Sequence, residues 1–402
     1  MDDSPDVSHS NTGTPPPGPL TGLTVVDLSR VLAGPYCTMV LADLGARVIK
    51  VERPGAGDDS RAIGPFKDGK SAYFTSINRG KESIALDLKA DADRKVFEAL
   101  LVRADVLLEN YRPGTMAKLG YGWDTLHARF PRLVYAAASG FGHTGPDSTK
   151  AAYDMVVQAM GGIMSVTGHP GGPPTRVGTS IGDITAGLFT VIGILAALRD
   201  RDANGAGRFV DVAMLDGQIA ILENAIARYA VTGEAPGPLG ARHPSITPFA
   251  AYRCADAHIV IAAGNDSLFS AMCGALGVGP LWDDARFATN AARSDNADAL
   301  QALMEAKLGE EPSGLWLEKL TDAGVPSGPL NNVAEALAEP QVKARNMVIE
   351  TAFEDGTPLT AAGNPVKISG FADPTTRQKA PALDEHRAGI LAELGLGSEG
   401  AD

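Results

Sequence analysis

Residues 20–52 read LTGLTVVDLSRVLAGPYCTMVLADLGARVIKVE, and this stretch indicates the fold class. A short β-branched run, LTVVDL, precedes the helical pattern GPYCTMVLADLGA and a second β-branched run, ARVIKVE. The alternation continues with SIALDL, ADRKVFEALLVRA, DVLLENY and RLVYAAAS. Strands and helices repeated in this way predict an α/β fold with a mostly parallel sheet, helices on its faces, and ligands at the carboxyl ends of the strands.

The pattern changes near residue 225. A Pro/Gly-rich passage, TGEAPGPLGARHPSITPF, precedes the strand-like HIVIAA and helical stretches at 267–275 and 296–322. These features predict a linker and a second, smaller α/β domain. Residues 1–17 are acidic, polar and Pro-rich, which predicts a disordered tail. They contain neither the basic nor the apolar region of a signal peptide, so we expect none.

Composition excludes several classes of function. The 402 residues carry a formal net charge of −13, which argues against nucleic acid as a partner. The three cysteines, Cys37, Cys254 and Cys273, are scattered without metal-ligand spacing, so we expect reduced core thiols in a cytoplasmic protein and no metal site. The longest apolar run, ITAGLFTVIGILAAL, is shorter than the ~20 residues of a membrane span and predicts a buried helix instead.

The loop after the first strand reads SRVLAGP and lacks the GxGxxG pattern of dinucleotide-binding proteins. Glu52, at the end of the second strand, keeps a dehydrogenase as an alternative. Arg53 follows, in a loop made irregular by Pro54, Gly55 and Gly57. A guanidinium at this position suits a phosphate, but on local sequence alone an ion pair on a solvated loop is the preferred interpretation.

More cations and an aromatic residue follow later strands. Lys89 comes after SIALDL, and NYRPG, with Asn110, Tyr111 and Arg112, comes after DVLLE; Lys118 is six residues further on. Each residue taken alone is consistent with an ordinary surface position. Their recurrence at successive strand ends favours a site for a nucleotide with its phosphates.

Asp183 lies in GTSIGDITAG (178–187), at the start of the apolar run. Its simplest interpretation is the N-cap of a helix beginning at Ile184. The same place also suits a nucleophile, because the helix N-terminus would keep the carboxylate ionised and Gly182 would let a ligand approach. A second acid, Asp154 in AAYDMVVQAMGG, would be a polar support or another cap.

These residues lie in long ordered strings that resemble the class III (CaiB/BaiF) CoA-transferases along nearly the whole chain. The strings are the stretch from residue 20 to GAGD, then NRGKESIALDLK, VLLENYRPG, GFGHTGP, AAYDMVVQAMGG, GDITAG and GVPSGPLNNVAEALAEPQV. The resemblance implies that Asp183 is the nucleophile, with Gly182 and Asp154 beside it. The CoA contacts that it implies are Leu32, Ala33, Arg53, Leu86, Asp87, Leu88, Lys89, Asn110, Tyr111, Arg112, Lys118 and Tyr153.

The resemblance also implies an architecture. We expect an interlaced homodimer whose large Rossmann-like domain is made from residues 18–224 and, through a linker, 331–402, with a small domain and its linkers at 225–330. CoA and acyl-CoA would be substrates, with no permanently bound cofactor and no membrane partner. Asp183 would attack the donor thioester to form an anhydride, and the CoA thiolate would convert it to an aspartyl-CoA thioester. An acceptor carboxylate would then reverse the steps.

Two departures from related proteins bear on the reaction. In the acyl-CoA racemases of the family a histidine precedes the equivalent of Asp154, but here the residue is Tyr153, and neither His143 nor His169 is at that position. This favours CoA transfer over racemisation. A non-catalytic acyl-CoA binding protein is a further alternative.

The second departure concerns the substrate. Oxalate-type members have a run of glycines where this chain has GARHPSITPF, which argues against oxalate or formate. The chain is more similar here to dicarboxylate-using members such as succinyl-CoA:glutarate CoA-transferase, so we expect succinyl-CoA as the donor and a small dicarboxylic acid as the acceptor. Arg242, His243 and Ser245 would bind the distal carboxylate, or they form a plain linker.

Overall fold

The computed structural model describes residues 17–397. They form two compact units. The first comprises the residues up to 164, residues 176–233 and those from 340 on, and the second comprises 165–175 and 234–339. Of the predicted tail only Pro17 is among the described residues, and the predicted domain boundaries stay predictions.

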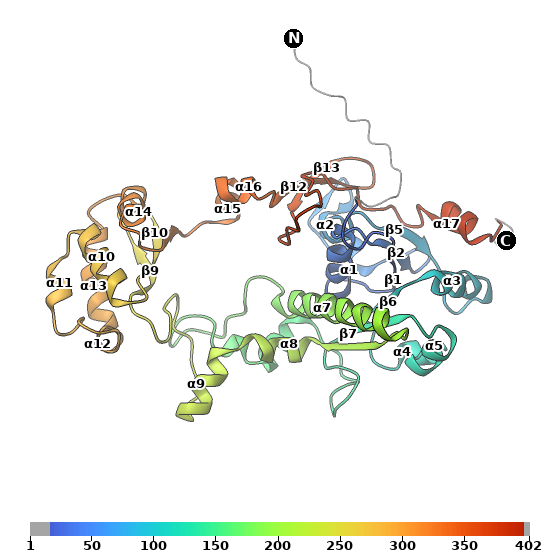
Figure 1. The fold of residues 1–402 in the computed structure, drawn as a ribbon, viewed down its shortest axis with the longest axis horizontal. Coiled ribbons are helices and arrows are strands. Elements are labelled where there is room, and N and C mark those ends of the chain that lie inside the picture. The colour runs from blue at the N-terminus through green and yellow to red at the C-terminus, as the bar shows by residue number, and fades with distance from the viewer. Residues whose placement is uncertain (1–16, 398–402) are drawn as a thin grey trace, which may run out of the picture. The chain divides into compact units, whose positions relative to one another are not determined.

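A six-stranded sheet forms the centre of the first unit (Figure 1). Its strands are β1 (Thr24–Asp27), β2 (Arg47–Glu52), β5 (Glu82–Ala85), β6 (Val106–Glu109), β7 (Val134–Ser139) and β8 (Phe209–Ala213). They lie in the order β5–β2–β1–β6–β7–β8, and every neighbouring pair is parallel. The predicted α/β class and parallel sheet are therefore confirmed. Because β2 and β6 lie on opposite sides of β1, the strand order reverses there, where α/β sheets bind ligands.

Helices cover both faces of this sheet. They are α1 (Ala33–Asp43), α3 (Asp91–Arg103), α5 (Trp123–Arg129), α7 (Ile181–Asn204) and α17 (Arg387–Leu394). Val25 and Val48 pack with α1 and α7, whereas the adjacent Val26 and Ile49 point the other way and pack with α3, α5 and α17. Burial on both faces explains why the strands are apolar throughout.

α7 is only half buried within the single chain. It packs on α1 and on the sheet, but Leu188, Phe189 and Ile192 remain exposed. The predicted burial thus applies to one face of α7 within this chain. α7 is also the one described helix long and apolar enough to cross a membrane, a test that core helices of globular proteins also pass. Its buried face identifies it as a core helix.

Shorter elements complete the first half of this unit. They are η1 (Asp59–Ala62), β3 (Phe66–Lys67), β4 (Lys70–Ser71), α2 (Ala72–Asn78), α4 (Thr115–Lys118), α6 (Asp154–Met160), η2 (Ile163–Ser165), α8 (Met214–Ile221) and α9 (Asn224–Thr232). Most of them connect the strands. α6, α7 and α8 pack against one another beside the end of β7.

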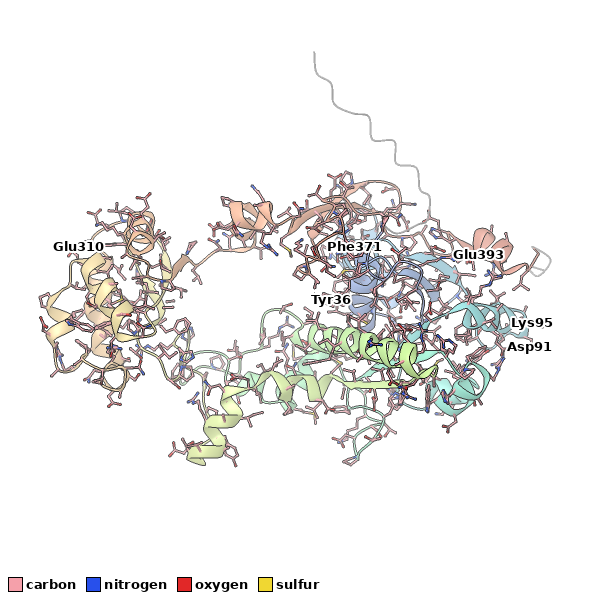
Figure 2. All side chains as sticks on the ribbon, in the orientation of Figure 1. Tyr36, Asp91, Lys95, Glu310, Phe371 and Glu393 are labelled. Atoms are coloured by element: carbon pink, nitrogen blue, oxygen red, sulfur yellow. The ribbon has the colours of Figure 1, made fainter. Side chains whose placement is uncertain are left out.

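The chain returns to the first unit after residue 339. This segment contains α16 (Pro340–Ala344), β12 (Val348–Ala352), β13 (Pro358–Ala362) and α17. Ile390 of α17 enters the core beside Phe97 and Leu101, and the carboxylate of Asp384 accepts the backbone N–H of Ala85 at 2.7 Å. Glu393, labelled in Figure 2, pairs with Arg47 of β2. The C-terminal segment thus completes the edge of the sheet at β5.

The second unit has its own apolar core and a three-stranded antiparallel sheet. Its strands are β9 (Phe249–Arg253), β10 (His258–Ala262) and β11 (Ser327–Pro329). Its helices are α10 (Asp266–Leu276), α11 (Pro280–Asp283), α12 (Asn290–Asp295), α13 (Ala297–Leu308), α14 (Ser313–Asp322) and α15 (Val333–Ala338). Arg293 is fully buried here, where its guanidinium donates to Asp266 and to the carbonyls of Thr247 and Phe287.

Candidate functional site

A cavity of about 210 Å³ opens at the carboxyl ends of β1, β6 and β7. Residues 30–33, 59, 110–113, 138–140, 150–153, 183 and 214 line it, and all of them belong to the first unit. We call it the strand-end cavity. It lies where the strand order reverses, so the topology alone makes it the expected ligand site of this sheet.

Asp183 is the third residue of α7, and Ser180 occupies the N-cap position. The predicted N-cap role of Asp183 is therefore wrong, because the helix begins at Ile181, three residues earlier than expected. No described residue donates a hydrogen bond to the Asp183 carboxylate, which lines the strand-end cavity. Its oxygens are therefore available to a ligand.

Burial and, to a lesser extent, the negative charge of Asp154 together raise the pKa of Asp183 to about 7. The helix N-terminus should favour the ionised form, but this effect is at most ~2 kcal/mol and here is outweighed. A pKa of about 7 leaves part of the Asp183 carboxyl protonated at neutral pH, and the ionising effect of the helix end stays a prediction. Acids that react in enzyme active sites often lie in cavities and have raised pKa values.

Asp154 caps the first turn of α7 from the start of α6. Its Oδ1 accepts the N–H of Gly182 at 2.8 Å, and its Oδ2 accepts the Nε2 of Gln158 at 2.7 Å. A Cβ on Gly182 would lie 2.7 Å from Val157 Cγ2 and 3.0 Å from Asp154 Oδ1. Glycine is therefore needed at position 182 for this close approach of α7 to α6, and its predicted role in admitting a ligand stays a prediction.

The structure brings about half of the predicted CoA contacts together. Six of the twelve line the strand-end cavity with Asp183, namely Leu32, Ala33, Asn110, Tyr111, Arg112 and Tyr153. Asn110 has a positioning role as well. Its Oδ1 accepts the N–H of Arg30 at 2.9 Å and its Nδ2 donates to the Arg30 carbonyl at 2.7 Å. This pair of bonds fixes the loop after β1 to the loop after β6.

The other predicted contacts lie outside the cavity lining, and their binding roles stay predictions. Leu86 and Leu88 are buried in the core, whereas Asp87, Lys89 and Lys118 are exposed. Arg53 is exposed and its guanidinium pairs at 2.6 Å with Asp59, which does line the cavity. Arg53 therefore contacts the cavity lining only through Asp59.

Three residues that the sequence reasoning did not select also belong here. Arg30 and Lys150 line the cavity. Arg30 follows the first predicted strand as Arg53 follows the second, so the same strand-end pattern could have identified it. Tyr73 of α2 is half-buried, and burial together with the charge of Asp183 raises the pKa of its hydroxyl to about 12. No sequence pattern linked Tyr73 to a residue 110 positions away.

A buried ion pair supports the loop after β1. Lys50 Nζ lies 2.8 Å from Asp58 Oδ2 and donates to the Ser29 carbonyl at 2.7 Å. Asp58 Oδ1 accepts the N–H of Val31 at 3.0 Å. Val31 has a φ of 66°, a conformation unfavourable for a β-branched residue. The pair thereby holds strained backbone next to Leu32, at the wall of the cavity.

Histidine is absent from the described lining of the strand-end cavity, and the nearest one in sequence to Asp154 is His143. His143 Nε2 lies 3.8 Å from Glu109 Oε1, and burial lowers the pKa of His143. Tyr153, which precedes Asp154, is 76% exposed. The arrangement therefore offers a carboxylate nucleophile but no histidine base beside Asp154.

The residues considered for a distal carboxylate belong to the second unit. Arg242 is already paired, with Asp298 at 2.5 Å and with Gln301 at 2.5 and 2.9 Å. The His243 ring stacks on Phe249 with centroids 5.1 Å apart, and its Nδ1 accepts the N–H of Ser245. Their role in substrate binding stays a prediction.

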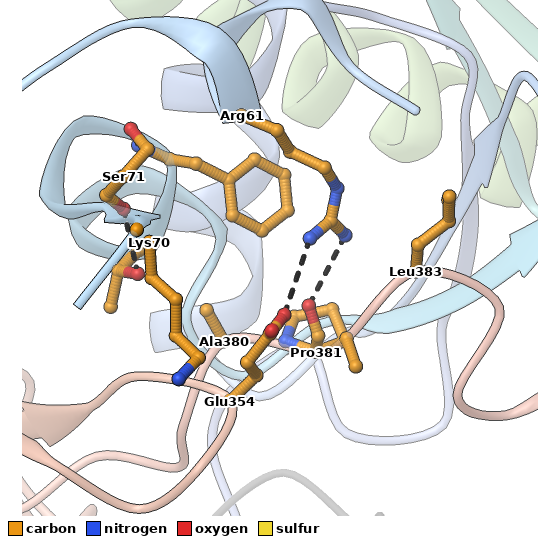
Figure 3. Close-up of a pocket in the computed structure, with 11 residues that line it drawn as sticks. Arg61, Lys70, Ser71, Glu354, Ala380, Pro381 and Leu383 are labelled. Carbon is orange, nitrogen blue, oxygen red and sulfur yellow. Dashed lines mark hydrogen bonds and ion pairs between the residues drawn. The ribbon is translucent and has the colours of Figure 1, made fainter. Parts of the chain in front are cut away.

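A second cavity, of about 260 Å³, lies between the β3–β4 hairpin and residues 380–383 (Figure 3). Its central cation, Arg61, makes two bonds to Glu52, and Figure 3 shows its contacts with Glu354 and the Pro381 carbonyl. Lys70 pairs with Asp355. Because Arg61 and Lys70 are both paired with carboxylates, this cavity is a weaker candidate for binding an anionic ligand than the strand-end cavity. Within residues 17–397 no cluster of acids, histidines and cysteines suits a metal ion.

Comparison with known proteins gives consistent matches. The family model for CoA-transferase family III matches residues 20–387. Acetyl-CoA:oxalate CoA-transferase of Acetobacter aceti is 48% identical, covering 95% of this chain and 97% of the relative. Succinate–glutarate CoA-transferase of Agrobacterium fabrum is 40% identical, with 94% and 96% covered. A CAIB/BAIF family protein from Brucella suis has a crystal structure similar to this fold, with a TM-score of 0.83, 41% identity, and 94% and 99% of the two chains covered.

Proposed function

The chain belongs to CoA-transferase family III, and we propose that it moves CoA from an acyl-CoA donor to a small dicarboxylic acid through Asp183. The family predicted from the sequence motifs is thereby confirmed, and the protein is a CoA-transferase. One observation carries the proposal for Asp183. It is the acid in the strand-end cavity whose carboxylate has no hydrogen-bond donor among the described residues.

The names of the relatives bear on the substrate. The two relatives above are named for oxalate and for succinate and glutarate, which are all dicarboxylic acids. Because a relative named for oxalate is 48% identical to this chain, the missing glycine run no longer argues against oxalate as a substrate. We therefore include oxalate with glutarate among the acceptors to be tested, and acetyl-CoA with succinyl-CoA among the donors.

The proposed reaction begins when a carboxylate oxygen of Asp183 attacks the thioester carbonyl carbon of the donor. The C–S bond breaks, leaving an aspartyl–acyl anhydride and the CoA thiolate. The thiolate then attacks the aspartyl carbonyl carbon, the donor acid leaves, and an aspartyl-CoA thioester forms. The acceptor carboxylate attacks this thioester, and the released thiolate finally attacks the acceptor acyl carbon, which frees Asp183.

The residues around Asp183 support this chemistry. Arg30, Arg112 and Lys150 supply cations for the phosphates of CoA at the same cavity as the acid. Asp154 is occupied by Gly182 and Gln158, so the two carboxylates have different tasks. Asp154 orients the first turn of α7, and Asp183 reacts.

The direct test measures CoA exchange. The protein is incubated with succinyl-CoA or acetyl-CoA and a panel containing oxalate, glutarate and monocarboxylates, and the CoA products are identified by mass spectrometry. We expect a new dicarboxyl-CoA without ATP and an intact-mass adduct at Asp183 during turnover. Transfer that proceeds while no adduct ever forms would contradict the covalent route.

The pH dependence of the reaction follows from Asp183. Only the ionised carboxylate attacks, so kcat/KM is expected to rise with pH through a midpoint near 7, the pKa of this carboxyl. Asp154→Asn removes the neighbouring negative charge while its Oδ1 still accepts from Gly182, so the midpoint should move to lower pH. An unchanged midpoint in Asp154→Asn would refute this coupling.

Exposed apolar side chains support assembly into a homodimer. α6 to α9 leave a set of large apolar residues exposed: Met155, Val156, Met160, Leu188, Phe189, Ile192, Ile219, Ile226, Tyr229 and Val231. A patch of this kind is unusual on a protein that remains a monomer. We expect a dimer by sedimentation velocity at micromolar concentration and a shift toward monomer in Ile192→Glu. A wild-type monomer under these conditions would contradict the assembly.

A further inference from the structure

Asp59 links two arginines that come from neighbouring strands. Arg30 follows β1 and Arg53 follows β2. Asp59 Oδ2 accepts from Arg30 Nη1 at 2.8 Å, and Asp59 Oδ1 accepts from Arg53 Nη2 at 2.6 Å. One carboxylate thus holds two guanidinium groups, one on each oxygen, and both Asp59 and Arg30 line the strand-end cavity.

The Asp59 side chain has no other task among the described residues. The carboxylate that caps η1 is that of Asp58, which accepts from the N–H of Ser60 at 2.8 Å. Asp58 also pairs with the buried Lys50. By contrast, the carboxylate of Asp59 contacts only Arg30 and Arg53. Structural needs of the loop are therefore met without Asp59.

The two ion pairs are easily exchanged. The side chains of Arg30, Asp59 and Arg53 are 46%, 41% and 60% exposed, and exposed pairs contribute little to stability. A phosphate offers guanidinium groups more oxygens and more charge than a carboxylate does. An incoming phosphate can therefore replace Asp59 as the partner of both arginines.

We propose that Asp59 is a competing anion, which occupies Arg30 and Arg53 in the free enzyme, is displaced by phosphate of CoA, and promotes CoA release when it returns. This inference rests on the proposed function. Asp59 thereby lowers the affinity for CoA esters. A lower affinity is useful to this enzyme because it must release a CoA ester as its product. It also keeps two exposed arginines from binding smaller anions.

Asp59→Asn tests this role, because the amide keeps the shape of the side chain and removes its charge. By calorimetry we expect the Kd for CoA to fall about three- to tenfold, with the dissociation rate constant falling by a similar factor. The salt dependence of CoA binding should become steeper, since two arginines are then unpaired. Pantetheine, which has no phosphate, should bind the variant and the wild type equally.

Glu98→Gln is the control, because it removes a half-buried carboxylate from Arg129 outside the cavity lining, while the amide oxygen of the new side chain can still accept from Tyr121. Its CoA affinity should equal that of the wild type. Weaker or unchanged CoA binding in Asp59→Asn would overturn the inference and assign Asp59 a merely structural role. If the wild-type protein does not bind CoA at all, the proposed function fails instead, so the two failures are distinguishable.

Discussion

Asp183→Asn reduces CoA transfer to less than about one part in 10³ of the wild-type rate, because an amide cannot form the acyl anhydride. The substitution is nearly isosteric, and no described residue donates a hydrogen bond to this carboxylate. CoA should therefore still bind. Steady-state transfer, calorimetry with CoA and intact-mass analysis during turnover measure the three expectations separately.

Stability supplies the control for this variant. The carboxyl of Asp183 has a pKa of about 7 in the fold but about 3.9 in an unfolded chain. Between these values the folded protein binds more protons than the unfolded one, so its stability decreases as pH rises. Asn avoids this loss, and Asp183→Asn should unfold at the same or a higher temperature than the wild type at pH 8. Retained transfer activity in Asp183→Asn would show that Asp183 is not the nucleophile.

Asp58→Asn is expected to destabilise the protein by about 3 kcal/mol, because it removes the carboxylate that pairs directly with the buried Lys50. The charges of Asp27 and Glu52 still favour the Lys50 ammonium, so the loss should lie at the low end for a broken buried pair. Asn can still accept from Val31 and Ser60 through Oδ1, but its NH₂ would face the Lys50 ammonium. Equilibrium denaturation in urea measures the loss. Loss of the Lys50–Asp58 pair should also loosen the loop after β1, which Lys50 holds through the Ser29 carbonyl, and so raise the Kd for CoA.

Asp59→Asn, one residue away, is the control for this measurement. Its two ion pairs are exposed, so its unfolding free energy should change by less than about 1 kcal/mol. Equal effects of the two variants would mean that the Lys50–Asp58 pair does not support the loop as described. Lys50 outweighs the effect of burial and holds the pKa of Asp58 well below its usual range, so its contribution should be complete above the unfolded-state pKa of about 3.9 and lost progressively as pH falls below it.

The sequence allowed the sheet to be predicted because its signal is local. LTVVDL, ARVIKVE and DVLLENY became β1, β2 and β6, and burial on both faces made each run apolar. The predicted helix at 296–322 is two helices, α13 and α14, with Pro312 as the N-cap residue of the second. A proline at that position does not continue a helix from the residues before it.

The details of the site depended on contacts that local patterns do not encode. The start of α7 at Ile181 is stabilised by Asp154, 27 residues earlier, and Tyr73 approaches Asp183 from a separate helix. The exposed side of α7 was missed for a related reason. Apolar periodicity predicts that a surface will be buried, but not whether the same chain buries it.

The return of residues 340–397 to the first unit has a consequence for synthesis. β5 receives Asp384 and α17 only after the whole second unit has been synthesised, and most of that unit is contiguous between 234 and 339. During translation the small unit can therefore fold while the larger one still exposes the side of its sheet at β5. We expect a nascent chain with this sheet edge exposed to bind chaperones. A stop codon that removes α17 should impair the folding of the first unit, although most of that unit precedes α17 in the sequence.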